Sequence, residues 1–155
     1  MKTRAGLTLL ELVVVLGIIA IMSVSVVQST RYNDRRNVHN AALTLQADLR
    51  YAQRRAIMEG RRVGIQFELA ENRYHIIEAR FTASAEPFDI IRTVQFENGV
   101  TLAHTNAPIP FFFLPRGTRT PGDAFNVALE GINRRNWRRI TVTVGGGRAE
   151  IQSPP

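Results

Sequence analysis

The sequence predicts an α+β fold in which a long N-terminal helix packs on antiparallel β-sheet. Three observations support this. An apolar run occupies residues 7–27, residues 31–59 carry apolar side chains at three- and four-residue spacing, and the rest of the chain alternates short apolar runs with turn residues. With 155 residues, the chain is long enough for one ordinary domain.

Residues 7–27 form the predicted apolar part of the helix. At 1.5 Å per residue these 21 residues extend about 31 Å, enough to cross a hydrocarbon core of roughly 30 Å. A short basic head, residues 1–6, precedes the run. Glu11 lies inside it, where a carboxylate costs roughly 2.5 to 3.5 kcal/mol at the membrane centre and less near an end. We expect this carboxylate either to lie among the headgroups or, if the chain is cut after Gly6, to neutralise the new amine of Leu7 on a neighbouring helix.

The second part of the predicted helix, residues 31–59, is amphipathic. Its apolar positions are Val38, Ala42, Leu45, Leu49, Ala52 and Ala56. Because no proline occurs before residue 86, one helix is expected from Leu7 to Glu59, with Gly60 as its C-terminal stop.

Short strands are predicted over the β-rich remainder, residues 61–155. The alternating apolar residues place them at 62–69, 74–81, 90–96, 100–105, 109–114, 124–129, 140–144 and 148–152, with a loop at 83–87. We expect residues 97–99 to form a three-residue hairpin loop. That loop would pair Phe96 with Val100 and Val94 with Leu102.

Composition argues against an enzyme, a metal site or a bound cofactor. The chain has no cysteine, and its one lysine is Lys2. His39, His75 and His104 are far apart in the sequence and lack the spacing of a helical metal pair, so we expect surface or cross-strand positions for them. The glycine run at 145–147 lacks the lysine of a phosphate loop and is expected to form a turn.

The segment from Gly6 to Leu12, reading GLTLLEL, resembles the class III leader of type IV pilins and pseudopilins. The resemblance implies that a prepilin peptidase cuts between Gly6 and Leu7 and methylates Leu7. It also implies that Glu11 assists the docking of subunits. The apolar helix, 7–27, would then serve first as membrane anchor and later as filament core.

The second half of the chain resembles the GspH/FimT type of minor pseudopilin and minor pilin. This resemblance is carried by the arginine-rich helix end at 49–60, by the motif FFFLPRG at 111–117, and by a final strand that runs into Gly147-Arg148. It implies a pilin-like extracytoplasmic body, residues 28–155, and sister pilins or pseudopilins as partners.

An arginine patch raises a second interpretation, DNA binding. Arginines surround a tryptophan in a short segment and recur near the C-terminus, at positions Arg134, Arg135, Trp137, Arg138, Arg139 and Arg148. Cations interleaved with an aromatic ring suit phosphate contacts and base stacking, whereas the same residues could also protect a strand edge or contact acidic subunits. Some FimT-type pilins bind DNA through a Gly-Arg-x-Arg loop, but here Glu150 stands at the second arginine.

The sequence therefore predicts a structural subunit of a type II secretion pseudopilus or type IV pilus. We expect a single-pass protein of the inner (cytoplasmic) membrane with a periplasmic body, processed by prepilin peptidase and assembled with sister subunits. The alternatives are a DNA-binding minor pilin for natural transformation and a single-span anchored binding domain. Removal of Lys2 and Arg4 with the leader lowers the formal charge from +7 to +5, so the mature chain is moderately basic.

Overall fold

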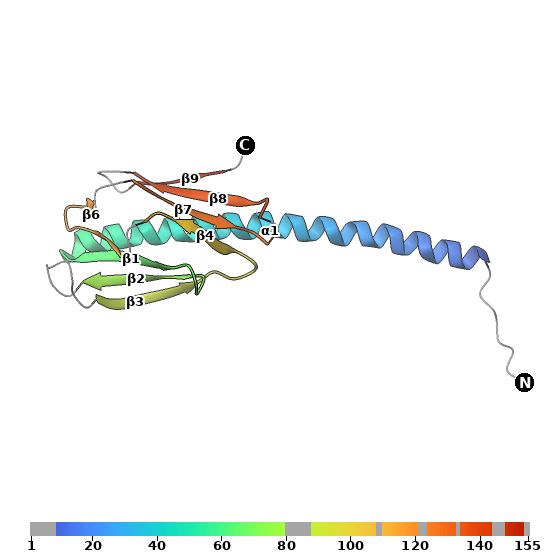
Figure 1. Ribbon diagram of the computed structural model, residues 1–155, viewed down its shortest axis with the longest axis horizontal. Helices are drawn as coiled ribbons and strands as arrows, with labels where there is room; N and C mark the ends of the chain where they lie inside the picture. The colour runs from blue at the N-terminus through green and yellow to red at the C-terminus, as the bar shows by residue number, and fades with distance from the viewer. Residues whose placement is uncertain are drawn as a thin grey trace, which may run out of the picture. The chain divides into compact units, whose positions relative to one another are not determined.

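The computed structural model describes residues 9–79, 88–107, 110–120, 124–132, 134–143 and 148–153, without the side chains of 23–32 and 119–120. The chain forms two compact units, Met1–Asn33 and Asp34–Pro155. Helix α1 (Leu9–Glu59) contributes residues to both units (Figure 1). The prediction of one continuous helix that ends before Gly60 is confirmed. Gly60 has a φ of 65°, the left-handed conformation that commonly follows a helix.

The second unit contains two antiparallel sheets. The first has the strand order β3-β2-β1-β5-β6 and the second the order β4-β7-β8-β9. The strands are β1 (Arg62–Glu68), β2 (Arg73–Ala79), β3 (Phe88–Gln95), β4 (Thr101–Thr105), β5 (Phe111–Phe113), β6 (Arg119–Thr120), β7 (Phe125–Glu130), β8 (Trp137–Val142) and β9 (Ala149–Gln152). The α+β fold predicted from the sequence is therefore observed.

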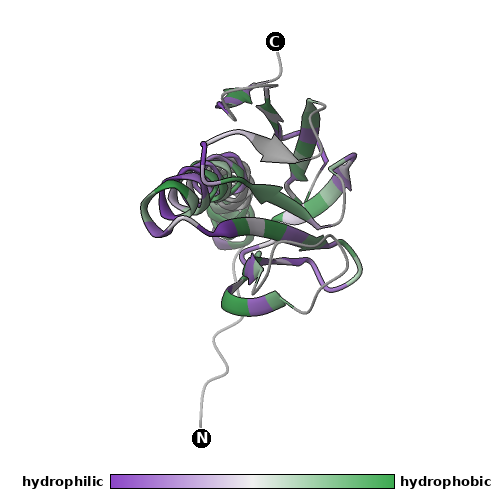
Figure 2. Ribbon diagram, turned by 90° about the vertical axis from the view of Figure 1, so that its left-hand side faces the viewer, coloured by the Kyte–Doolittle hydropathy of each residue, from purple (hydrophilic) through white to green (hydrophobic). Residues whose placement is uncertain are grey.

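The helix supplies one wall of the hydrophobic core. All six predicted apolar positions, Val38, Ala42, Leu45, Leu49, Ala52 and Ala56, are at most 1% exposed. Rings from the strands meet them, and the ring centroid of Phe111 lies 4.6 Å from that of Phe125 in a tilted contact that joins the two sheets. Seen along the helix in Figure 2, the strands lie on one side of it, with hydrophobic and hydrophilic positions interleaved.

The predicted hairpin at residues 97–99 is wrong. The turn itself is present, since the Val100 amide donates to the Glu97 carbonyl and Asn98 and Gly99 have φ values of 55° and 76°. The strands on either side, however, belong to different sheets, because β3 pairs with β2 and β4 pairs with β7. Val94 consequently lies opposite Tyr74 instead of Leu102.

The side chain of Asn72 explains why the chain crosses between sheets at this turn. Its amide donates to the carbonyls of Phe96 and Val100, at 3.2 and 2.9 Å, and its oxygen accepts the Leu102 amide at 2.7 Å. These bonds supply partners that a hairpin would otherwise provide between its own strands. Phe96 and Val100 are then free to bury their side chains in the core.

Two further strand assignments differ from the predictions. The short strand β6 was expected to be loop, and β8 begins at Trp137, three residues before the predicted start. The predicted loop at 83–87 and the glycine run at 145–147 lie outside the described residues. The earlier start of β8 matters for the arginine patch, because strand alternation then decides which side each arginine faces.

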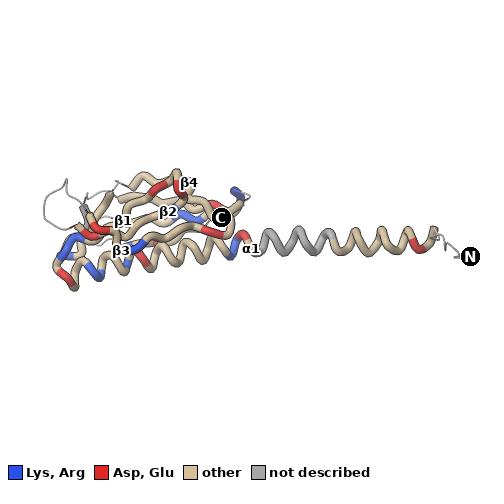
Figure 3. The backbone as a smooth tube through the Cα atoms, turned by 90° about the horizontal axis from the view of Figure 1, so that it is seen from below, with Lys and Arg blue, Asp and Glu red and all other residues tan. Residues whose placement is uncertain are grey.

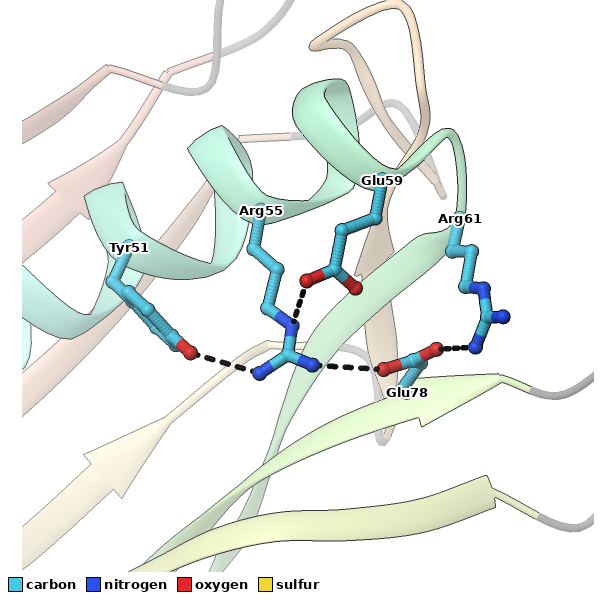
Figure 4. A network of polar contacts seen from close by, with 5 residues as sticks. All are labelled: Tyr51, Arg55, Glu59, Arg61 and Glu78. Carbon is cyan, nitrogen blue, oxygen red and sulfur yellow. Dashed lines mark hydrogen bonds and ion pairs between the residues drawn. The ribbon is translucent and has the colours of Figure 1, made fainter.

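An ion-pair network joins the C-terminal end of α1 to strand β2 of the first sheet (Figure 4). Arg55 contacts Glu59 at 3.0 Å and Glu78 at 3.4 Å, and donates to the Tyr51 hydroxyl at 2.9 Å. Arg61 donates to the other oxygen of Glu78 at 2.6 Å. Because Glu78 lies in β2, this network fixes where the helix ends relative to the strands.

Candidate functional site

The first unit presents an apolar helical surface. Large side chains around the whole circumference of α1 are exposed, from 45% at Val15 to 83% at Leu9. Only Glu11 is charged between residues 9 and 22, and it appears as the single acidic band of this part of the helix in Figure 3. A water-soluble helix normally confines its apolar residues to one stripe, so this surface is suited to an apolar environment.

Glu11 lies in the first turn of the described helix. A carboxylate is favourable there, because the unpaired amide groups of the first turn give the helix N-terminus a partial positive charge. The predicted cleavage residues, Gly6 and Leu7, lie outside the described residues, as does part of the predicted span at 7–27. Within the part of the chain that the structure describes, no helical stretch meets the length and hydropathy required to cross a membrane.

A loop that carries two of the predicted patch residues is held by Asp34 of α1. The Asp34 side chain is 3% exposed, and its carboxylate oxygens accept hydrogen bonds from the Ile132 amide at 3.0 Å and from the Asn136 side chain at 2.8 Å. Gly131 fits this arrangement because any side chain there would overlap the carboxylate. Arg134 closes the turn by donating its amide to the Gly131 carbonyl at 2.9 Å. We call residues 131–136 the Asp34-anchored loop.

The predicted patch residues do not all face the same way. Arg134 and Arg135 are exposed on the Asp34-anchored loop, and Arg139 is exposed on β8 with its guanidinium 5.5 Å from the Trp137 ring centroid. Arg138 lies on the opposite face of β8, the face shared with the core residue Ile140, and is 6% exposed. The structure therefore brings Arg139 to the Trp137 ring, leaves Arg134 and Arg135 exposed on the loop before β8, and separates Arg138 from Arg139.

The buried guanidinium of Arg138 lies in an unusual electrostatic setting. It donates to the carbonyl of Trp137 at 2.9 Å, while its Nε has no hydrogen-bond partner among the described residues. Burial lowers the pKa of Arg138, and the positive charge of Arg35 on α1 lowers it further. Arg35 therefore acts on this group of arginines, although it is distant from them in the sequence.

Among the described residues, Arg148 forms its ion pair with Glu150 and not with a residue of the Asp34-anchored loop. It precedes β9 and contacts Glu150 at 3.4 Å, with both side chains largely exposed. The glutamate that replaces the second arginine of the Gly-Arg-x-Arg pattern thus offsets the charge of the first. The structure therefore does not form a continuous phosphate-binding surface that includes Arg138, Arg139 and Arg148.

Two buried polar groups in the core have structural partners. Asp48 on α1 accepts the Tyr74 hydroxyl at 2.6 Å and is paired with Arg92 of β3. Burial and the neighbouring Asp48 both raise the pKa of Tyr74. These contacts tie the helix to β2 and β3, and the sequence offered no signal for them because the partners are distant along the chain.

The histidines also have ordinary positions. His39 and His104 are exposed, and His75 is a cross-strand residue 2.8 Å from the Thr93 hydroxyl and 3.3 Å from Glu68. Among the described residues, no group of three histidine or acidic side chains has an arrangement that would hold a metal ion.

Comparison with protein families gives two matches. Residues 41–146 match the family described as type II transport protein GspH. Residues 1–27 match the prokaryotic N-terminal methylation motif. No curated protein sequence matches the chain.

Solved structures share the fold. The minor pseudopilin EpsH from the type 2 secretion system of Vibrio cholerae is 16% identical, with a TM-score of 0.61 over 76% of this chain and 98% of that one. The type IV minor pilin FimU of Pseudomonas aeruginosa is 20% identical, with a TM-score of 0.60 over 80% and 92%. Escherichia coli GspH is 16% identical, with a TM-score of 0.60 over 77% and 89%.

Proposed function

The chain belongs to the GspH family of type II transport proteins, the minor pseudopilin and minor pilin type of subunit, and we propose that it is built into a secretion pseudopilus or type IV pilus. One observation carries the proposal. An N-terminal methylation motif is followed in the same chain by a GspH region whose helix packs on two antiparallel sheets. The role is structural, as it is for the family.

The proposal assigns a task to each part of the chain. Residues 1–6 are a leader that prepilin peptidase removes, residues 7–27 are the membrane anchor and later the filament core, and residues 28–155 form the body. The exposed apolar side chains of residues 9–22 support the second assignment, because lipid or other apolar helices would cover them. The body would lie on the extracytoplasmic side of the inner membrane.

We propose that Glu11 sets the position in which the apolar helix docks against a neighbouring subunit. A carboxylate among apolar neighbours is stabilised by an opposite charge, and the methylated amine of Leu7 on a neighbouring subunit would supply one. The position of Glu11 in the first turn supports this role, since both groups would then lie near helix N-termini.

Neither alternative function has the same support. DNA binding through the predicted patch requires Arg138 and Arg139 to act together, yet they lie on opposite faces of β8. A single-span binding domain without a filament would not need a methylation motif in front of a GspH region.

Site-specific cross-linking tests the proposal. The chain contains no cysteine, so a single Leu16→Cys substitution in the apolar helix gives one reactive position. The thiol is labelled with a maleimide that carries a photoreactive benzophenone. On irradiation of cells that express the assembly machinery, we expect the benzophenone to insert into a C–H bond of a sister pilin or pseudopilin and give a covalent adduct. The matched control is His104→Cys, which places the thiol on the exposed surface of β4.

Two outcomes separate the interpretations. An adduct from Leu16→Cys that disappears when Gly6→Val blocks processing supports a filament subunit. A Leu16→Cys adduct no more abundant than that of His104→Cys, in cells that assemble normal filaments, would overturn the proposal and favour an anchored domain.

A further inference from the structure

One end of the second unit is rich in arginine. Arg35 and Arg36 lie at the start of its helix, next to Asp34, and Arg134 and Arg135 lie on the loop that Asp34 holds. Arg138 approaches Arg35 from β8. Among the described residues, none of these five arginines forms an ion pair with a carboxylate. We call this group the arginine end.

The nearby carboxylates do not balance this charge. Asp34 uses both oxygens to hold the loop, Glu130 lies opposite Trp137 in the strand register, and Glu97 lies on the turn whose Gly99 approaches Ile132. Arg138 is buried, but Arg139 beside Trp137 joins the four exposed arginines of this end, so five exposed arginines stand against three carboxylates. An excess of positive charge remains, and nothing in the described part of the fold accounts for it.

The sequence places this end next to the apolar segment. Asp34 follows Val27 by only seven residues. A connection of seven residues extends at most about 25 Å. The headgroup layer on each side of the hydrocarbon core is roughly 5 to 7 Å thick, and charges at physiological salt act over about 8 Å. The chain connection therefore holds the arginine end within about 25 Å of Val27, close enough for its arginines to meet a headgroup layer if residues 7–27 span a membrane.

We propose that the arginine end binds the anionic headgroups of phospholipids while the subunit is stored in the membrane. This rests on the proposed function only through its membrane anchor, and it adds a second lipid-binding surface on the body. Arginine forms paired hydrogen bonds with phosphate oxygens. The half-buried Trp137 beside these arginines fits an interfacial position, since its ring has an apolar body and a polar N–H group.

A headgroup contact has a consequence for assembly. Each arginine that binds phosphate on a surface of anionic lipid adds to the free energy that holds the subunit there. Leaving the membrane for a filament would require those contacts to be replaced. The arginine end therefore tunes the release of the subunit, separately from the docking role proposed for Glu11.

The chain supplies its own probe for this contact. Trp137 is its one tryptophan, so emission reports directly on the arginine end. The full chain is reconstituted into vesicles of phosphatidylcholine alone or with about one third phosphatidylglycerol, both containing a lipid with a quencher on the headgroup. We expect quenching of Trp137 to be at least about twofold greater in the anionic vesicles and to weaken as salt is raised.

A matched pair of variants makes the test specific. Arg134→Gln with Arg135→Gln removes two charges from the arginine end and should abolish most of the dependence on lipid charge. Arg50→Gln with Arg54→Gln removes two charges from an exposed part of α1 outside the arginine end and should leave it unchanged. All variants are compared at equal vesicle recovery.

The outcomes are distinguishable from failure of the proposed function. A chain that does not float with the vesicles contradicts the membrane anchor and this inference together. A chain that floats, but whose Trp137 is quenched equally in neutral and anionic vesicles, overturns this inference alone. Equal effects of the two arginine pairs, or protection of Trp137 by added duplex DNA without any dependence on lipid charge, also overturn it.

Discussion

Substitution of Asp34 by alanine is the perturbation with the most direct structural consequence. The carboxylate is 3% exposed and holds the Asp34-anchored loop through two hydrogen bonds, to the Ile132 amide and the Asn136 side chain. Alanine leaves both donors without these acceptors. The loop would lose its only described link to a helix carboxylate, and Arg134 and Arg135 would lose their fixed position.

The expected loss of stability follows from these contacts. A hydrogen bond to a charged group contributes about 1.5 to 3 kcal/mol, so two contribute roughly 3 to 6. Part of this is offset because the folded variant no longer has to bury a carboxylate. We therefore expect Asp34→Ala to lower the free energy of unfolding by about 2 to 4 kcal/mol, or the melting temperature by roughly 4 to 16 °C.

Urea titration of the full chain in detergent micelles measures this loss. Trp137 emission follows the transition, because the tryptophan directly succeeds the Asp34-anchored loop. Asp34→Asn keeps one acceptor and should lose less than Asp34→Ala. Glu97→Ala removes the same charge from an exposed side chain and should change stability by less than about 0.5 kcal/mol. A loss below that limit for Asp34→Ala would refute the reasoning that the carboxylate organises the loop.

Four further predictions concern the core, the isolated body, the pH dependence and the anchor. Leu49→Ala should cost about 2 to 5 kcal/mol by the same titration, since this side chain is 1% exposed, and a chain that starts at Gln28 should still fold as a soluble monomer by circular dichroism and sedimentation. The pKa of Tyr74 is raised in the folded state, so the free energy of unfolding contributed by its protonated hydroxyl is complete below the unfolded pKa of about 10 and declines above it. Tyr74→Phe should therefore lose less free energy of unfolding than the wild type between about pH 10 and 11. Glu11→Val should retain the chain in the membrane but lower its recovery with sister pilins in pull-downs, and wild-type recovery would contradict the docking role.

Much of the fold follows from regular spacing in the sequence. The six apolar positions between Val38 and Ala56 recur at helical intervals, and all of them are buried. Alternation in Val63, Ile65 and Phe67 likewise predicts the buried face of β1. Both patterns are local, because each residue is placed by the geometry of its own helix or strand.

Contacts between distant residues could not be predicted in this way. The sequence Glu97-Asn98-Gly99 suits the same tight turn whether the strands pair or separate, and the deciding bonds come from Asn72, up to 30 residues away. The partners of Asp34 are 98 and 102 residues away. Neither arrangement leaves a periodic signal.

The arginine patch shows how a boundary error affects a predicted site. When Trp137 to Arg139 are treated as loop, all the arginines can face one partner. Because β8 begins at Trp137, alternation instead turns Arg138 toward the core and Arg139 toward solvent. The structure also adds Arg35, which the sequence separates from Arg138 by about a hundred residues.

The central claim is that this chain is a processed filament subunit, and the mass of its mature N-terminus tests that claim most directly. The chain is isolated from membranes of cells that contain a prepilin peptidase and sequenced by tandem mass spectrometry, with Gly6→Val as the uncut control. We predict an N-terminal peptide that begins at Leu7 and carries one methyl group on its amine. An intact Met1 in the assembled protein, or cleavage between Ser23 and Ser29 as in a secretory signal peptide, would contradict the account.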